Sequence, residues 1–147
     1  MQLDHEKLDV YAVALDFAVW AYALCRDLKG LDRPTRDQLL RASQSIALNI
    51  AEGCGKIPPA ERGRFLQIAS GSARECGAIL DILGRCGTLD GEAVRKGKEL
   101  LVRIVAMLTR MIERGTQVRE GEAVYGYVNE NGNVGKSGQP EGAGDSQ

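Results

Sequence analysis

Apolar residues recur at alternating steps of three and four along four stretches of the chain, which is the spacing of amphipathic α-helices. We predict helices over residues 6–28, 34–52, 59–86 and 91–114. Glycine and proline separate them, in short connections near residues 30–33, 54–58 and 87–90. Because short connections place consecutive helices side by side in opposite directions, the pattern predicts an all-α fold, an antiparallel up-down-up-down four-helix bundle.

Each predicted helix carries an apolar stripe that identifies its core-facing side. The stripes of the first three helices are Leu8, Tyr11, Leu15, Ala18, Tyr22 and Cys25; Leu39, Ser43, Ile46 and Ile50; and Phe65, Ala69, Ser72, Cys76, Ile79 and Leu83. The fourth helix has two adjacent stripes, which are Leu101, Val105, Leu108 and Ile112, and Leu100, Ile104, Met107 and Met111. This face is wider than one bundle core requires, so either the helix is central in the monomer or it also packs on another subunit.

Small residues repeat every seven positions along the third predicted helix, at Gly63, Ser70, Gly77 and Gly84. A glycine in the middle of a helix costs about 1 kcal/mol relative to alanine, and close approach of another helix would offset that cost. Neutral drift is the alternative. Together with the wide face of the last helix, this stripe favours a homo-oligomer.

Composition and charge divide the chain into two parts. With 147 residues, 44% of them hydrophobic and 5% aromatic, one helical domain is expected over residues 1–118. Residues 119–147 are rich in glycine and predict a flexible acidic tail, in which residues 124–128 before Asn131-Gly132 are able to form a hairpin. Residues 1–119 hold 18 Lys and Arg against 15 Asp and Glu, whereas residues 120–147 hold one against five. The body is therefore mildly basic.

The chain shows no signal for a membrane span, a secretory leader or a metal site. No apolar run approaches the roughly 18 residues that a transmembrane helix needs, and the amino terminus lacks a basic-then-apolar pattern, so a cytoplasmic protein is expected. The four cysteines lack C-x-x-C spacing and one histidine accompanies them, so neither metal nor cofactor is expected.

Short polar residues interrupt the apolar stripe at the end of the second predicted helix. Ser45, Asn49 and Glu52 share one face beside Ile46 and Ile50, which predicts a half-buried polar network. Across the tight turn, its expected partners on the third helix are Arg64, Ser72 and Glu75. Catalysis or metal binding by these carboxylates is the alternative. Because no Glu-x-x-His motif and no nucleophile–base pair accompanies them, we expect a structural network and no enzyme.

Cations line the polar face of the fourth predicted helix at Lys96, Arg103, Arg110 and Arg114. They are the candidates for binding a nucleic-acid backbone, and Arg33, Arg36 and Arg41 form a second set. The alternative is a solvated face, on which Glu92, Glu99 and Glu113 are available as ion-pair partners. In a ring of subunits the cationic row would repeat and form a multivalent positive surface.

The segments 8–11, 38–42, 45–53 and 64–72, together with Glu75, resemble the four-helix-bundle proteins of the 23S rRNA intervening-sequence family. The resemblance covers roughly residues 8–113 and implies an antiparallel bundle, often assembled as a homopentameric barrel. It extends more loosely to the accessory variability determinants of diversity-generating retroelements, which implies an adaptor that binds RNA and a reverse transcriptase. We therefore expect a non-enzymatic oligomeric adaptor; the alternative is a ring-forming protein-interaction scaffold with no nucleic-acid role.

Overall fold

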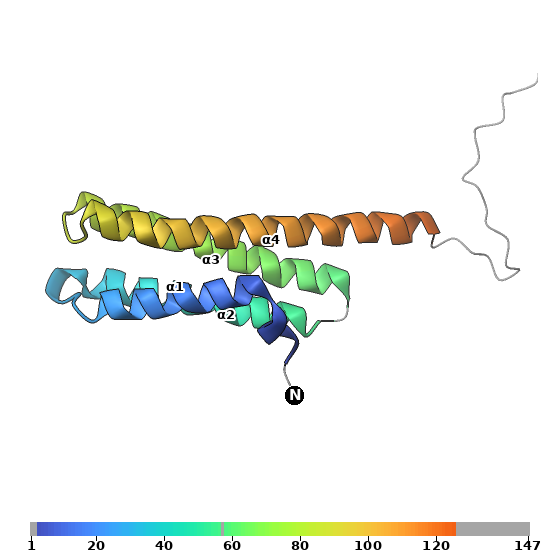
Figure 1. The fold of residues 1–147 in the computed structure, drawn as a ribbon, viewed down its shortest axis with the longest axis horizontal. Coiled ribbons are helices and arrows are strands. Elements are labelled where there is room, and N and C mark those ends of the chain that lie inside the picture. Colours follow the sequence, from blue (N-terminus) through green and yellow to red (C-terminus); the bar gives the residue numbers. More distant parts are fainter. Residues whose placement is uncertain (1–2, 57, 126–147) are drawn as a thin grey trace, which may run out of the picture.

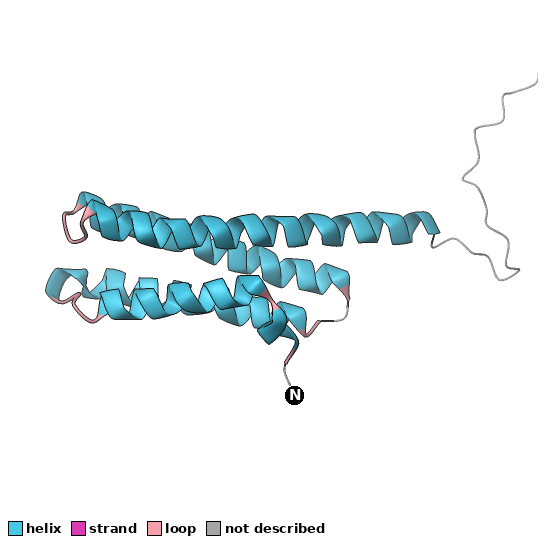
Figure 2. Ribbon diagram, in the orientation of Figure 1, coloured by secondary structure: helices cyan, strands magenta, loops and turns pink. Residues whose placement is uncertain are grey.

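The computed structural model of the chain is an up-and-down bundle of helices (Figure 1). It describes residues 3–56 and 58–125, with side chains over 3–6, 8–56 and 58–115. These residues form α1 (Asp9–Cys25), α2 (Arg33–Cys54), α3 (Pro59–Arg85) and α4 (Gly91–Tyr125), with the 3-10 turns η1 (Asp4–Lys7) and η2 (Gly30–Asp32). No strand occurs within the described ranges (Figure 2). The predicted all-α four-helix bundle is confirmed.

The helix boundaries agree with the prediction for α2 and α3 and differ for α1 and α4. The backbone of Leu8 is extended, with φ −92° and ψ 129°, so η1 and α1 are separate elements. Helix α4 does not end at residue 114 but continues to Tyr125, through the domain boundary expected at 118/119. A single Gly115 costs too little to stop a long helix. The predicted hairpin begins inside α4, and the rest of the predicted tail, residues 126–147, lies outside the described residues.

The hydrophobic core lies between the four helices, and most positions of the stripes predicted for α2 and α3 belong to it. Leu39, Ser43, Ile46 and Ile50 of α2 are fully buried. Every predicted position of α3 is buried except Phe65, which is half-buried. Core packing by alternating three- and four-residue steps therefore holds for both helices.

The stripe predicted for α1 is largely wrong. Its core-facing residues are Val10, Val13, Ala14, Phe17, Ala21 and Cys25. Leu15 and Tyr22 are 42% and 45% exposed instead. Between Asp9 and Cys25, Asp16 is the one further charged residue, so α1 is apolar on every side. Several stripes then satisfy the same spacing, and periodicity cannot choose among them.

Contacts within one chain explain the wide apolar face of α4. Helix α4 packs against both α3 and α1, and both of its stripes contribute buried or half-buried residues to the core. Two glycines of the small-residue stripe face α4 of the same chain, and at Gly84 the approach is too close for a larger residue without a shift. A Cβ at Gly84 would lie 3.0 Å from Cγ2 of Val94, and one at Gly77 would lie 3.8 Å from Cδ1 of Leu101. The prediction that another subunit docks on these two glycines is therefore wrong. Gly63, by contrast, faces open space.

The two ends of the bundle are built differently (Figure 1). The α1–α2 and α3–α4 connections lie at one end, where Gly30 and Gly87 take the left-handed φ values of 60° and 77°. Thr88 Oγ1 donates to the Asp32 carboxylate there, at 3.3 Å from Oδ1 and 3.4 Å from Oδ2. The α2–α3 connection lies at the opposite end, and α4 projects beyond it. Within the described ranges, no helix has the length and apolarity to cross a membrane.

Candidate nucleic-acid interface

A polar network links α2 to α3 at three of the predicted residues. The hydroxyls of Ser45 and Ser72 lie 2.9 Å apart, so one donates to the other. Asn49 Nδ2 donates to the Ser45 hydroxyl at 3.0 Å and to the Ser45 carbonyl at 2.8 Å. This chain of bonds satisfies half-buried polar groups between two packed helices. Its geometry fixes the register of α2 against α3.

The other predicted members lie apart from this network. Glu75 accepts a hydrogen bond from Gln38 Nε2 at 3.0 Å, one turn away. Glu52 and Arg64 are exposed, and neither makes a hydrogen bond or ion pair within the described residues. The contact at the turn is apolar, because a Cβ at Gly53 would lie 3.0 Å from Cβ of Phe65. That packing leaves Glu52 and Arg64 on the outer surface.

The arrangement of the polar network offers little for acid–base or metal chemistry. The serine hydroxyls and the Asn49 amide are used by one another. Among the residues whose side chains are described, no group of three or more His, Cys, Asp or Glu side chains is placed to hold a metal ion. The expectation of a non-enzymatic protein stays a prediction.

The four α4 cations, which are Lys96, Arg103, Arg110 and Arg114, are all exposed. Within the described part of the chain none of them forms an ion pair. Two of their expected partners are taken by a residue that sequence analysis did not single out. Arg95 pairs with Glu92, and its Nη1 lies 2.6 Å from Oε1 of Glu99. These bonds raise the pKa of Arg95 further, with Glu92 as the larger cause.

Two of the α4 cations face carboxylates across a groove between α1 and α4. Arg103 and Arg110 line this groove of about 520 Å3 with Asp9 and Asp16. Both pairs are seven residues apart on their own helices. In an antiparallel pair of helices, matching spacing places one carboxylate opposite each arginine. The aspartates therefore offset the charge of Arg103 and Arg110 and leave that of Lys96 and Arg114.

The three cations of the second predicted set differ in their exposure and in their hydrogen bonds. Arg33 and Arg41 are exposed, and Arg41 lines a polar groove of about 320 Å3 with Ser45, Ser72 and Glu75. Arg36 is different, because its guanidinium group donates to Asp37 Oδ1 at 3.0 Å and to the Leu28 carbonyl at 3.4 Å. This half-buried arginine holds the α1–α2 connection and has less freedom to meet a phosphate.

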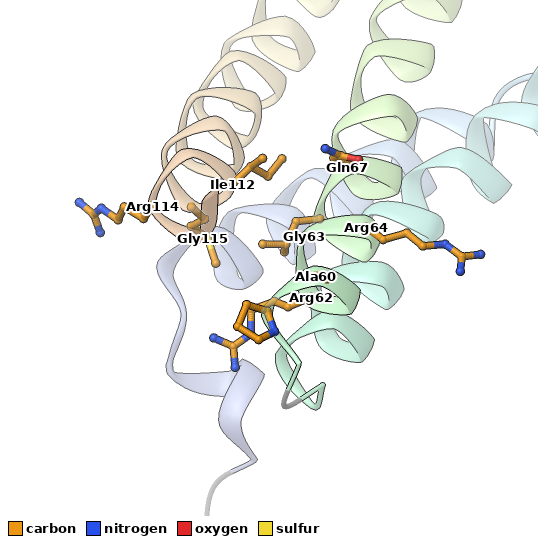
Figure 3. Close-up of a pocket in the computed structure, with 11 residues that line it drawn as sticks. Ala60, Arg62, Gly63, Arg64, Gln67, Ile112, Arg114 and Gly115 are labelled. Atoms are coloured by element: carbon orange, nitrogen blue, oxygen red, sulfur yellow. The ribbon is translucent and has the colours of Figure 1, made fainter. Parts of the chain in front are cut away.

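A further basic groove lies between the start of α3 and α4, at the end opposite η2. Arg62, Arg64 and Arg114 line this end groove of about 400 Å3 (Figure 3). Gly63 of α3 and Gly115 of α4 also line it. Sequence analysis missed Arg62 and placed Arg64 in the polar network. The available signal was the sequence Arg62-Gly63-Arg64, which brackets the first glycine of the small-residue stripe.

The model of the 23S rRNA-intervening sequence protein family matches residues 6–110 of the chain. The chain belongs to this family. It is also similar to the crystal structure of a protein of unknown function from the S23 ribosomal protein family of Bacteroides thetaiotaomicron VPI-5482. The two share 26% sequence identity and a TM-score of 0.66, over 70% of this chain and 97% of that chain. No curated protein matches the chain.

Membership of the 23S rRNA-intervening sequence protein family covers the bundle and the candidate interface alike. The matched residues include the polar network, the end of α3 that lines the end groove, and three of the four α4 cations. Arg114 lies just beyond the match. The predicted resemblance to this family is confirmed, and its name associates the bundle with ribosomal RNA.

Proposed function

We propose that this protein is a non-enzymatic, oligomeric adaptor that binds RNA through the exposed cations of α4. The observation that carries the proposal is the exposure of Lys96 and Arg114, which form no ion pair within the described residues, while Arg95 occupies Glu92 and Glu99. Cations that remain unpaired on a surface are free to neutralise phosphates and release counterions. The family name supports RNA over DNA.

One copy of the chain carries too little positive charge to bind RNA tightly, and assembly would remedy this. Val19 of α1 is 70% exposed. Leu15 and Tyr22 of the same helix, and Leu48 of α2, are also exposed apolar residues. Tyr22 accepts a hydrogen bond from Gln44, so this apolar face spans α1 and α2. A helix that is apolar on every side is normally covered. We assign a second copy of the chain to this face, in a ring for which the resemblance implies five subunits.

Binding of a reverse transcriptase is the more specific form of the proposal. It is supported by the motif resemblance to the accessory variability determinants of diversity-generating retroelements. The observation that tests it is genomic. A neighbouring reverse-transcriptase gene with template and variable repeats would support this partner, and a neighbourhood without them would remove it.

Titration of a fluorescently labelled RNA fragment across a salt series tests RNA binding itself. The logarithm of the affinity should fall linearly with the logarithm of salt concentration. Replacing Lys96 by alanine should weaken binding and reduce the salt slope by about one. Arg95→Ala is the matched control, because the charge of Arg95 is already paired on the same helix.

The same titration decides between the adaptor and the scaffold. An intact oligomer that binds no RNA even at about 50 mM salt, where phosphate contacts are strongest, is a protein-interaction scaffold without a nucleic-acid role. Equal losses of RNA affinity in Arg95→Ala and Lys96→Ala would also contradict the proposal that the unpaired cations of α4 bind RNA.

A further inference from the structure

The end groove exists because two helices each place a glycine where a side chain would otherwise fill the space. Gly63 of α3 and Gly115 of α4 both line it, and a Cβ built at either glycine meets no atom within 4 Å. Figure 3 labels Gly63 on α3 and Gly115 on α4, the two helices that border the groove. Neither position requires glycine for backbone conformation, since both lie within regular helix. The glycines open the groove without providing a close helix contact.

The rim of the end groove is positive on both sides. Arg62, Arg64 and Arg114 are among the residues that line it. In Figure 3 the side chain of Arg114 points outward from α4 and that of Arg64 points outward from α3 in the opposite direction, while Arg62 lies at the lower end of the groove. No carboxylate is among the lining residues whose side chains the structure describes. The Arg62 guanidinium is held by the Lys56 carbonyl at 3.3 Å. This composition differs from the α1–α4 groove, where Asp9 and Asp16 accompany the arginines. The end groove is therefore bordered by three positive residues, and none of the described residues that line it is acidic.

The interior of the end groove is mostly apolar with one amide. Its wall is formed by Pro59, Leu66, Met111 and Ile112. Gln67 also lines it, is exposed and makes no hydrogen bond within the described residues. Apolar surface suits the flat face of a base, and an amide offers one donor and one acceptor to a base edge.

We propose that the end groove binds one nucleotide of a single-stranded RNA, with its base against the apolar wall and its phosphate outside the groove, beside Arg62 at its lower end. The proposal rests on the proposed RNA-binding function and names the site at which a nucleotide is held. The cations along α4 then contact the backbone of the same strand, because Arg114 belongs both to the end groove and to the α4 row. The charge of three arginines attracts the phosphate, and the two glycines give the base its space.

Filling the groove without changing its charge tests the shape of the site. Gly63→Leu places a side chain in the open space, keeps all three arginines and favours helix formation. A labelled single-stranded RNA of about ten nucleotides, a length that one basic groove is able to span, should bind about tenfold more weakly. Gly71→Leu is the matched control. Gly71 lies on the same helix, also faces open space and does not line the groove, so affinity should not change.

Removing charge tests the phosphate contact. The double variant Arg62→Ala with Arg64→Ala should lower the affinity for the same RNA and reduce its salt slope by about two. The control is Arg74→Ala with Arg85→Ala, which removes two exposed arginines of α3 outside the groove. Circular dichroism and chemical denaturation of each variant show whether the bundle is retained.

The outcomes separate this proposal from the function on which it rests. If the wild-type protein binds RNA and loses affinity in Lys96→Ala, but not in Gly63→Leu or the Arg62 and Arg64 double variant, the groove is overturned and RNA binding stands. If the wild-type protein binds no RNA at low salt, the proposed function itself fails. If the groove variants and their controls lose the same amount of RNA affinity, the loss does not come from the groove. That result also overturns the nucleotide site.

Discussion

The indole ring of Trp20 on α1 lies against Gly97 on α4. The two helices therefore pack a large side chain against a residue that has none. A Cβ added at Gly97 would stand 2.5 Å from Cη2 of the ring and 2.7 Å from Cδ1 of Leu80. The ring of Phe17 also packs against Trp20, with centroids 5.7 Å apart. Gly97 is buried, and the space above it is occupied by the aromatic ring. Glycine is the residue that this position of α4 accommodates.

Gly97→Ala should destabilise the bundle. The new methyl group must displace Trp20 or Leu80, and overpacking of this kind costs about 1–3 kcal/mol. The gain in helix propensity, about 1 kcal/mol, offsets part of it. We expect a lower denaturant midpoint in urea unfolding. Gly71→Ala is the control and should be neutral or stabilising, because that position faces open space. A stabilised Gly97→Ala protein would contradict the packing described.

Ser72→Ala should weaken the junction of α2 and α3 by about 0.5–1.5 kcal/mol, the usual net value of one hydrogen bond. The variant removes the bond to Ser45, while Asn49 continues to donate to the Ser45 hydroxyl. A double-mutant cycle with Ser45→Ala, measured by urea denaturation, should show coupling between the two serines. RNA affinity should stay at the wild-type level. Loss of RNA binding at unchanged stability would indicate that the network is a functional site.

Folding stability should fall in alkaline solution because of Cys76. Burial, with a smaller contribution from the neighbouring Glu75 carboxylate, raises the pKa of this thiol from 9.0 to about 12. Above the ordinary pKa the unfolded chain releases the proton while the folded chain still holds it. The unfolded state therefore gains stability between these two pKa values. Between about pH 8 and pH 10.5, wild type should lose about 1–2 kcal/mol more than Cys76→Ala. If the free energy of unfolding changed equally with pH in the two proteins, this contribution of Cys76 would be excluded.

The same burial predicts an order of thiol reactivity. Cys86 is exposed, whereas Cys25 and Cys76 are buried and all four cysteines are free thiols. Because the thiolate is the reactive form, an alkylating reagent at neutral pH should label Cys86 first and Cys76 after unfolding. Mass spectrometry of peptides after timed labelling measures this order. Early labelling of Cys76 would show that the core opens near the middle of α3.

Val19→Asp should dissociate the proposed ring. The substitution places a charge in the exposed apolar face of α1, where burial against a second copy would be costly. Light scattering during size-exclusion chromatography should show a smaller species that keeps its helical circular dichroism. Ile82→Asp on α3 is the control, since Ile82 is exposed outside this face. A wild-type protein that already runs as a monomer would remove the basis of the assembly proposal.

The sequence predicts the bundle well because α2 and α3 have apolar residues on one side and polar residues on the other. It does not predict the core face of α1, because that helix offers apolar residues in every direction. Nor does it predict the position of Trp20. The partner of this ring is a glycine on another helix, and periodicity within one helix carries no information about which residue lies opposite.

The candidate interface was predictable in part. The α4 cations follow from spacing within one helix, and their exposure agrees with it. The end groove joins Arg62 and Arg64 to Arg114, about fifty residues apart in sequence, and depends on the crossing of α3 and α4. The small-residue stripe predicted close packing at Gly63 as at Gly84. Since α4 contacts α3 closely at Gly84 but leaves space at Gly63, the same residue type serves opposite purposes at the two positions.

The bond between Thr88 and Asp32 has a mechanical consequence. The chain consists of two hairpins, α1–α2 and α3–α4, that are joined covalently at the α2–α3 connection. Away from that connection, the two hairpins are held together by the shared core. Because Thr88 and Asp32 join the two hairpins at the far end, they close the pair into a frame. Fraying of the two hairpins at this end then requires the release of the Thr88 hydroxyl as well as separation of the core.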